Sequence, residues 1–364
     1  MPETRTAEDP TKAILSDSGL NKKALCDYVI NVATGCRHGC RFCYVPSTPN
    51  IRTRPDMLND AADVEDPQRE WGDYVLYRDD LPERLDAHLD RKRTWTETEG
   101  GQGIVGVSFH TDCFMDERAA EITAGVIETL ADHEQYCRIL TRNPMLAAQY
   151  LDTFVEAGEY VTVGSSIPTL NEAHMDALEP DAPPIESRLR GLERFAEAGV
   201  STYVSMSPTY PGMNVRDIEA LLERISAVDP DVVFHEPINP RGGNYQMTVA
   251  AAEEAGCDGL ARQLVNVQGP DAWLRYAVSH FRAVQRLGDE LGLPIYLWPD
   301  AQLVEQAEGR FERYLQHWRD RQSPEGFAGR PTPSTPPMDI GAIRKTPSQQ
   351  SALGEFAADG GESR

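Results

Sequence analysis

A repeated alternation of short apolar runs with longer helical patterns constrains the fold of this chain more than any other feature. Six β-branched, apolar runs read as buried strands, at residues 28–33, 104–109, 138–141, 160–164, 201–206 and 232–235. Helical periodicity lies between them at residues 117–132, 145–156, 185–198 and 215–228. Strands joined through helices run parallel, with right-handed crossovers. The sequence therefore predicts an α/β fold, an open or partial (β/α)6 TIM-like barrel.

The chain divides into a predicted barrel and three flanking segments. We expect residues 1–25 to form an N-terminal extension and residues 26–256 the barrel, with an irregular, charged insertion at about residues 50–103 that holds one helix at 81–91. Residues 257–322 predict a C-terminal helical extension, with helices at 271–291 and 301–319 and a short strand or extended link at 294–298. Pro, Ser, Thr and Gly dominate residues 323–364, which we expect to be a disordered tail.

Three cysteines follow the first predicted strand with C-x3-C-x2-C spacing: Cys36, Cys40 and Cys43. Three thiolates on one loop can hold three corners of a 4Fe-4S cluster and leave the fourth iron open to another ligand. The alternative is structural zinc, but no second cysteine pair follows, and His38 inside the loop would make a cramped fourth ligand. The spacing therefore favours an iron-sulfur cluster.

The cysteine motif, with Phe42 before its last cysteine and Tyr44 after it, resembles the signature of the radical S-adenosylmethionine (SAM) superfamily. The resemblance implies a 4Fe-4S cluster, SAM as second cofactor, and reductive cleavage of SAM to a 5'-deoxyadenosyl radical that abstracts hydrogen from a substrate. It also implies an electron donor such as ferredoxin or flavodoxin as partner. The superfamily core is a partial barrel, and barrel-like folds place their chemistry at the carboxyl ends of the strands, where the cysteine loop lies.

Short motifs after the next strands resemble the branch that contains spore photoproduct lyase, often labelled DNA repair photolyases. These motifs include His110-Thr111-Asp112, Leu140-Thr141-Arg142, Ser165-Ser166-Ile167 and Leu178-Glu179-Pro180 with Arg188 downstream. The resemblance places Arg142 near the carboxylate of SAM, which a guanidinium suits, and Ser166 near the same cofactor. The full set of expected cofactor-binding residues is Phe42, Tyr44, His110, Asp112, Arg142, Ser165, Ser166 and Arg188.

Two positions depart from that branch. A cysteine hydrogen donor of spore photoproduct lyase aligns with Phe109, and a tyrosine aligns with Phe42, but neither phenylalanine can donate hydrogen from sulfur or oxygen. Cys113 is a candidate replacement, and the alternative is a bystander thiol. The resemblance still favours the photolyase-like branch, with radical modification of a peptide or small metabolite as the alternative, so the substrate is either a nucleic acid or a peptide or small molecule. An alternative from another class is a non-catalytic iron-sulfur electron carrier or a zinc-stabilised binding module.

A second polar loop, residues 234–244, follows the sixth predicted strand. Its prolines and glycines fix the path of the chain, and its polar side chains are typical of a binding site. His235 and Glu236 are a candidate catalytic acid-base pair, and Arg241 is a candidate carboxylate or phosphate binder. The alternative is a rigid turn that closes the rim of the barrel.

The charge of the chain bears on its environment. The net charge is -23, and only five of the 35 basic residues are lysines. Acid excess with scarce lysine resembles proteins of salt-loving organisms, so we expect a halophilic protein, whose charge concentrated salt would screen. The charge therefore excludes few partners. Seven cysteines, no secretory leader and no apolar run near the ~20 residues of a membrane span predict a soluble, cytoplasmic protein without a membrane partner.

Overall fold

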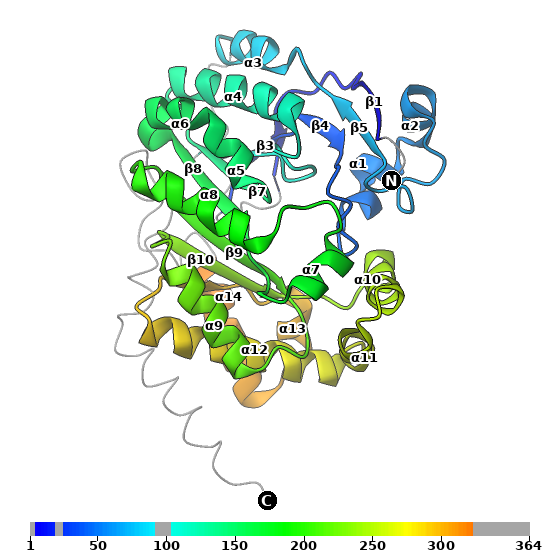
Figure 1. The fold of residues 1–364 in the computed structure, drawn as a ribbon, viewed down its shortest axis with the longest axis vertical. Coiled ribbons are helices and arrows are strands. Elements are labelled where there is room, and N and C mark those ends of the chain that lie inside the picture. Colours follow the sequence, from blue (N-terminus) through cyan, green and yellow to red (C-terminus); the bar gives the residue numbers. More distant parts are fainter. Residues whose placement is uncertain (1–3, 19–24, 92–102, 323–364) are drawn as a thin grey trace, which may run out of the picture.

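An eight-stranded sheet forms the centre of the computed structural model, which describes residues 4–18, 25–91 and 103–322 (Figure 1). Its strands are β2 (Ser16–Asp17), β3 (Tyr28–Ile30), β6 (Val105–Val107), β7 (Cys137–Thr141), β8 (Val161–Ser166), β9 (Ser201–Thr209), β10 (Val232–Pro237) and β11 (Ile295–Leu297). The order in space is β11-β10-β9-β8-β7-β6-β3-β2. All neighbours are parallel except β2 and β3. The described sheet ends at β2 and β11 without closing, so the partial barrel is confirmed.

The six predicted strands are confirmed as β3, β6, β7, β8, β9 and β10. The predicted link at 294–298 is the additional strand β11, which pairs in parallel with β10. The segment 257–322 is therefore mostly helical, but it also extends the sheet. The predicted tail at 323–364 lies outside the described residues.

Helices cover the outer face of the sheet. The helices between the strands are α4 (Glu117–Asp132), α5 (Pro144–Ala147), α6 (Leu151–Ala157), α7 (Glu172–Leu178), α8 (Ile185–Glu197) and α9 (Val215–Ser226). The single helix predicted at 145–156 was wrong, because the 3-10 turn Ala148–Tyr150 separates α5 from α6. This arrangement lets α5 pack closely on α8, where a side chain at Gly191 would lie 2.6 Å from Pro144.

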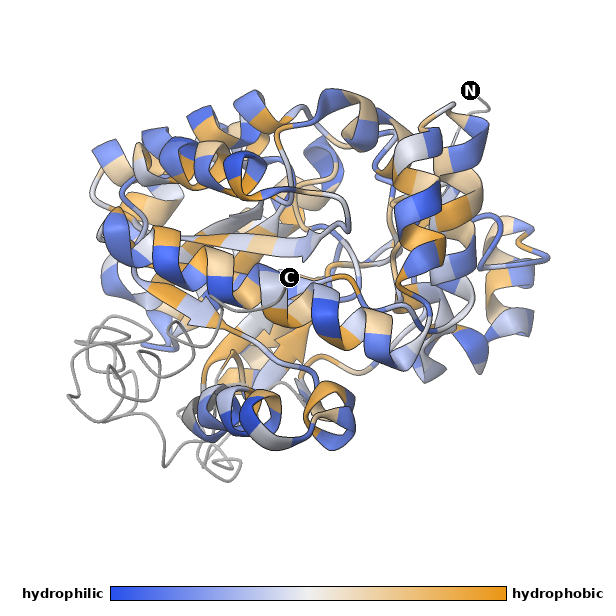
Figure 2. Ribbon diagram, turned by 90° about the horizontal axis from the view of Figure 1, so that it is seen from below, coloured by the Kyte–Doolittle hydropathy of each residue, from blue (hydrophilic) through white to orange (hydrophobic). Residues whose placement is uncertain are grey.

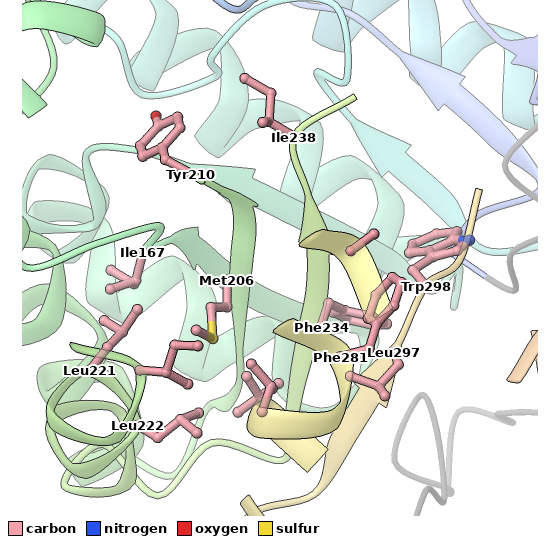
Figure 3. Close-up of a cluster of buried hydrophobic side chains, with 14 of the residues drawn as sticks. Ile167, Met206, Tyr210, Leu221, Leu222, Phe234, Ile238, Phe281, Leu297 and Trp298 are labelled. Carbon is pink, nitrogen blue, oxygen red and sulfur yellow. The ribbon is translucent and has the colours of Figure 1, made fainter. Parts of the chain in front are cut away.

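The longer of these helices, α4, α8 and α9, bury an apolar stripe, and the hydropathy colouring shows helices with a hydrophilic and a hydrophobic side (Figure 2). In α9 the buried residues are Ile218, Leu221, Leu222 and Ile225, a spacing of three and four residues. A capping box of Asn214 and Asp217 starts this helix. Met206 of β9 lies between the sheet and the leucines of α9 (Figure 3).

The C-terminal part of the described chain adds five helices: α10 (Gly243–Glu254), α11 (Asp258–Asn266), α12 (Pro270–Glu290), α13 (Ala301–Gln306) and α14 (Gly309–Gln322). The predicted helix at 271–291 is confirmed as α12, which packs beside β10 and β11. The helix predicted at 301–319 is instead divided into α13 and α14. Gly309, with a φ of +59°, makes the turn between them. No helix among the described residues is long and apolar enough to cross a membrane.

A second, three-stranded sheet carries the cysteine loop. Its strands are β1 (Arg5–Glu8), β4 (Ala33–Gly35) and β5 (Tyr74–Tyr77), in the order β1-β5-β4. The insertion that contains β5 also forms α1 (Pro49–Arg52), α2 (Pro55–Ala62) and α3 (Leu81–Leu89), of which only α3 was predicted. Since β4 ends directly before the first cysteine, this sheet fixes where the loop begins.

Strand register sets which side chains point into the barrel. Residues aligned across parallel strands face the same side, and every second residue of a strand faces the interior. Gly164 of β8 aligns with Tyr203 of β9. One step further, Ser166, Ser205 and Phe234 align across β8, β9 and β10. The ring of Tyr203 packs directly against Gly164, which has no side chain. A Cβ at position 164 would lie only 2.4 Å from this ring.

Candidate active site

A cavity of about 760 Å³ opens at the carboxyl ends of the central strands. Aromatic rings that point into the barrel, among them Tyr203, Phe234 and Trp298, form the apolar part of this cavity. Ten of the fourteen candidate site residues line it: Cys36, Cys40, Phe42, Cys43, Tyr44, His110, Asp112, Arg142, Ser166 and Glu236. The topology therefore brings most of the predicted site together from the cysteine loop and from the strands β6, β7, β8 and β10.

The cysteine loop starts in a conformation that requires glycine. Gly35 has a φ of +96°, and a Cβ at this position would lie 2.3 Å from the carbonyl oxygen of Tyr74 in β5. The Thr111 hydroxyl donates to the Gly35 carbonyl from the loop after β6. The start of the loop is thus fixed between the two sheets.

Two other segments hold the far end of the loop. The backbone N–H of Arg41 donates to the carbonyl of Leu178 at the end of α7, over 2.9 Å. The side-chain amide of Asn244 in α10 donates to the carbonyl of Phe42, also over 2.9 Å. The polar loop after β10 therefore supports the cysteine loop directly.

The three cysteine thiols share one buried environment. Cys36 and Cys40 are buried and Cys43 is half-buried. Burial is the main cause that raises the pKa of each thiol to about 12. Without a metal the thiols are therefore held neutral, whereas metal coordination would favour the thiolate.

The spread of the cysteine sulfurs discriminates between a zinc ion and a cluster. Among the described residues, donor atoms within 4.8 Å of one another occur in only one group of three, Asp86, Asp90 and His133 on the outer surface. At least one pair of the three cysteine sulfurs therefore lies more than 4.8 Å apart, beyond the about 3.8 Å between two sulfurs that each lie 2.3 Å from one tetrahedral zinc. This spread fits a cluster of several irons and argues against a single zinc ion.

His38 is a buried anchor rather than a metal ligand. Its Nδ1 lies 3.1 Å from the carbonyl oxygen of Asp181, and its Nε2 lies 3.1 Å from Oδ2 of Asp112. Both ring nitrogens therefore face oxygen acceptors inside the protein. The fourth ligand that the zinc alternative would need is not available from this side chain.

Asp112 is the most heavily bonded carboxylate at the cavity. It accepts hydrogen bonds from the backbone N–H groups of Arg142, over 2.6 Å, and Phe114, over 2.9 Å, and from the Thr141 hydroxyl, over 2.7 Å. Burial alone would raise the pKa of Asp112, but His38 and these hydrogen bonds hold it well below its ordinary value. Asp112 is thus a carboxylate inside the protein.

A buried ion-pair triad lies behind Cys40. Glu179 Oε2 accepts from Arg142 Nε over 2.9 Å and from the Arg188 guanidinium over 2.7 Å. The side chains of Glu179 and Arg188 are fully buried, and that of Arg142 is 19% exposed. The ion pair of Arg142 is therefore not a surface salt bridge, because its partner Glu179 lies in the core.

Four candidate residues lie outside the cavity wall. The Arg188 guanidinium supports the site from behind, since it also donates to the Ser166 carbonyl over 2.9 Å. The Ser165 hydroxyl donates to the Thr141 carbonyl over 2.7 Å, because alternation along β8 turns it away from Ser166. Cys113 is fully buried in the core, where burial raises the pKa of its thiol well above the ordinary value. It does not reach the cavity as a hydrogen donor would.

The predicted acid-base pair of His235 and Glu236 was wrong. Consecutive residues of β10 point to opposite faces, so Glu236 lines the cavity while His235 points outward. His235 Nε2 lies 3.0 Å from the Thr209 hydroxyl and its ring packs against Phe281 of α12. Burial, followed by the neighbouring His280, holds the pKa of His235 well below its ordinary value. His235 is therefore a neutral core residue.

The remaining candidates lie at the cavity wall. His110 Nδ1 accepts from the side-chain amide of Asn50 over 2.9 Å, and burial lowers the pKa of the imidazole. The ring of Phe42 lies 5.4 Å from the Arg142 guanidinium. Tyr44 is 54% exposed at the cavity, so it is not a core residue.

Sequence reasoning missed three residues that build the site. Glu179 was noted within a motif but not as the partner of two arginines, because its burial depends on tertiary structure. Asn244 was seen only as part of a polar loop. Tyr203 could have been found from the alternation along β9, where it precedes two further inward positions, Ser205 and Ser207.

Comparison with known proteins agrees with this geometry. A sequence model described as the Radical SAM superfamily matches residues 30–225. An uncharacterized protein of Acidianus two-tailed virus is 30% identical over 243 residues, 65% of this chain and 76% of the relative. An uncharacterized protein of Methanocaldococcus jannaschii is 23% identical over 197 residues, 54% of this chain and 64% of the relative.

Solved structures of spore photoproduct lyase share the fold. A variant with bound AdoMet and dinucleoside spore photoproduct superposes with a TM-score of 0.55 over 80% of each chain, at 12% identity. The lyase complexed with dinucleoside spore photoproduct gives a TM-score of 0.52 over the same shares, at 14% identity. At these identities the likeness concerns the fold alone.

Proposed function

The chain belongs to the radical SAM superfamily, and from this premise we propose that Cys36, Cys40 and Cys43 hold a 4Fe-4S cluster beside a SAM-binding site. Together these cofactors supply reductive cleavage of SAM and a 5'-deoxyadenosyl radical that abstracts hydrogen from a substrate. The observation that carries the proposal is the cysteine triplet on the wall of a cavity of about 760 Å³. Pockets of about 300–1,000 Å³ are typical of sites that bury a drug-sized ligand.

Arg142 is the best candidate for binding the carboxylate of SAM. Its Nε is used by Glu179, and among the described residues its two terminal nitrogens make no hydrogen bond. A guanidinium in this state can bind a carboxylate through two N–H groups. The triad of two arginines and one glutamate keeps a net positive charge at this wall, which also favours a carboxylate.

The wall of the cavity supports a small or peptide substrate over a nucleic-acid strand. Arg142 is paired with Glu179, and Arg241 is paired with Asp300 over 2.7 Å. Each arginine of the described wall thus has an acidic partner, whereas strand binding relies on cations that neutralise phosphates. The competing candidate is a photolyase-like enzyme that acts on nucleic acid. It is supported by the similarity of the fold to spore photoproduct lyase and by the aromatic rings of the cavity.

Anaerobic reconstitution with iron and sulfide, followed by SAM and dithionite, tests the proposal. We expect 5'-deoxyadenosine from the wild type and from Cys257→Ala, whose thiol lies outside the cavity, but none from Cys40→Ala. Absence of 5'-deoxyadenosine from the wild type would support the electron-carrier alternative instead. Turnover by Cys40→Ala would contradict the cluster assignment.

The same assay separates the substrate classes. Metabolite, peptide and nucleic-acid fractions of a cell extract are added separately to the reconstituted protein. We expect the metabolite or peptide fraction to raise 5'-deoxyadenosine formation. A rise with the nucleic-acid fraction alone would favour the photolyase-like reading.

A further inference from the structure

We propose that Asp112 is a positioning residue that joins the cysteine loop to Arg142 and makes no contact with either cofactor. The inference rests on the proposed function, because it concerns how this chain prepares the two cofactor sites. It differs from the sequence-based expectation, in which Asp112 itself binds the cofactor. Four groups surround the Asp112 carboxylate: the backbone N–H groups of Phe114 and Arg142, the Thr141 hydroxyl and the His38 imidazole.

Groups of the protein itself surround the carboxylate of Asp112. An ionised carboxylate offers about four lone-pair sites. Oδ1 accepts from the Phe114 N–H and the Thr141 hydroxyl. Oδ2 faces His38 Nε2 at 3.1 Å and accepts from the Arg142 N–H at 2.6 Å. With three hydrogen bonds accepted, the His38 ring beside Oδ2 and only 4% of the residue exposed, Asp112 acts through its neighbours.

His38 carries this connection to the cluster site. It lies two residues after Cys36 and two before Cys40, and it is 2% exposed. Asp112 holds its Nε2 from the β6 side, and the Asp181 carbonyl holds its Nδ1 from the loop between α7 and α8. The imidazole therefore braces the middle of the cysteine loop between two segments of the barrel.

Arg142 carries the connection to the SAM site. Asp112 fixes its backbone N–H, while Glu179 fixes its Nε over 2.9 Å. The preceding Thr141 is held by the same carboxylate. Oδ2 of Asp112 thus contacts both His38 and Arg142. A shift of this oxygen would therefore change the position of the cysteine loop relative to the Arg142 guanidinium.

Asp112→Asn separates the two connections. The side-chain oxygen of asparagine can still accept from Phe114 and Thr141, which leaves its NH2 group where Oδ2 was. That group opposes the Arg142 N–H, but the imidazole of His38 can accept from it. The variant therefore breaks the connection to Arg142 and keeps the connection to the cysteine loop.

The test measures cofactor loading without turnover. Iron content is determined after anaerobic reconstitution, and SAM affinity is measured per loaded cluster by equilibrium dialysis with radiolabelled SAM. We expect Asp112→Asn to keep at least two thirds of the wild-type iron and to bind SAM at least tenfold more weakly. Asp217→Asn, which alters a carboxylate in the capping box of α9 outside the cavity wall, should match the wild type in both measurements.

A second variant tests the other connection. His38→Phe keeps a ring in the loop but loses both contacts, so we expect less than half of the wild-type iron and an unchanged SAM affinity per loaded cluster. Wild-type SAM affinity in Asp112→Asn, or full iron loading in His38→Phe, would overturn the inference while leaving the proposed function intact. A wild type that loads no cluster would overturn both.

Discussion

Replacing Glu179 by glutamine should destabilise the fold strongly. Glu179 is fully buried between the guanidinium groups of Arg142 and Arg188, at 2.9 and 2.7 Å. Glutamine keeps the volume but removes the negative charge, so two cations remain close together with little access to water. Removing one partner of a buried ion pair destabilises proteins by about 3–5 kcal/mol. A value near 4 kcal/mol lowers the ratio of folded to unfolded protein about a thousandfold.

Urea unfolding of the metal-free protein, followed by circular dichroism at fixed salt concentration, measures this difference without a contribution from cluster loss. The matched control is Glu186→Gln, which removes a carboxylate 3.0 Å from Arg224 in a pair whose side chains are 62% and 36% exposed. Exposed pairs contribute about 0–1 kcal/mol, so this variant should unfold near the wild type. If both variants unfolded at the same urea concentration, the triad would not have the energetic role that its burial implies.

Three further predictions use the same protein. Gly35→Ala should destabilise the fold by about 1–3 kcal/mol in urea unfolding and reduce iron loading, because the backbone would be strained and the new Cβ would press against β5. The control Gly259→Ala in α11 should stabilise the fold by about 1 kcal/mol. Equal effects of the two substitutions would contradict the role given to Gly35. Arg142→Gln should weaken SAM binding at least about tenfold in equilibrium dialysis, or ~1.4 kcal/mol, while His235→Gln in the core leaves SAM affinity unchanged. A loss of SAM affinity in His235→Gln but not in Arg142→Gln would place His235 in the site. Burial alone would raise the pKa of Glu179, but its two arginine partners hold it below its ordinary value. The carboxylate therefore contributes stability above about pH 4.3 that is lost as the pH falls through the lower folded-state pKa. The difference between wild type and Glu179→Gln should then shrink in urea titrations toward acid, and a difference independent of pH would refute the ion-pair explanation.

Sequence alone was sufficient for the parts of the fold that local pattern determines. The strands β6 to β10 were predictable because β-branched and apolar residues gather in short runs there, as expected for strands of a parallel sheet that is covered on both faces. The small sheet was missed because β1 and β5 pair across 69 positions, from Arg5 to Tyr74, and no local pattern encodes such a register. The division of the predicted helix at 145–156 depends equally on packing, here against Gly191.

The candidate site also has a part that local sequence predicts and a part that depends on tertiary structure. The cysteine triplet was predictable because spacing on one loop encodes a ligand set directly. The pairing of His235 with Glu236 failed although the alternation of a strand was available to exclude it. The partners of Arg142 could not be predicted, since Glu179 lies 37 positions away and its burial follows from the packing of α7 and α8. A ligand set on a single loop could thus be predicted from the sequence, whereas side-chain contacts between different loops could not.

The way the cysteine loop is anchored has a consequence for the order of events during biosynthesis. Its partners include Thr111 after β6, Leu178 and Asp181 beside α7, and Asn244 in α10. A nascent chain that ends before α10 carries all three cysteines but lacks the last of these supports. We therefore expect iron and sulfide to be bound only after synthesis has passed α10, although the three cysteine ligands are made much earlier.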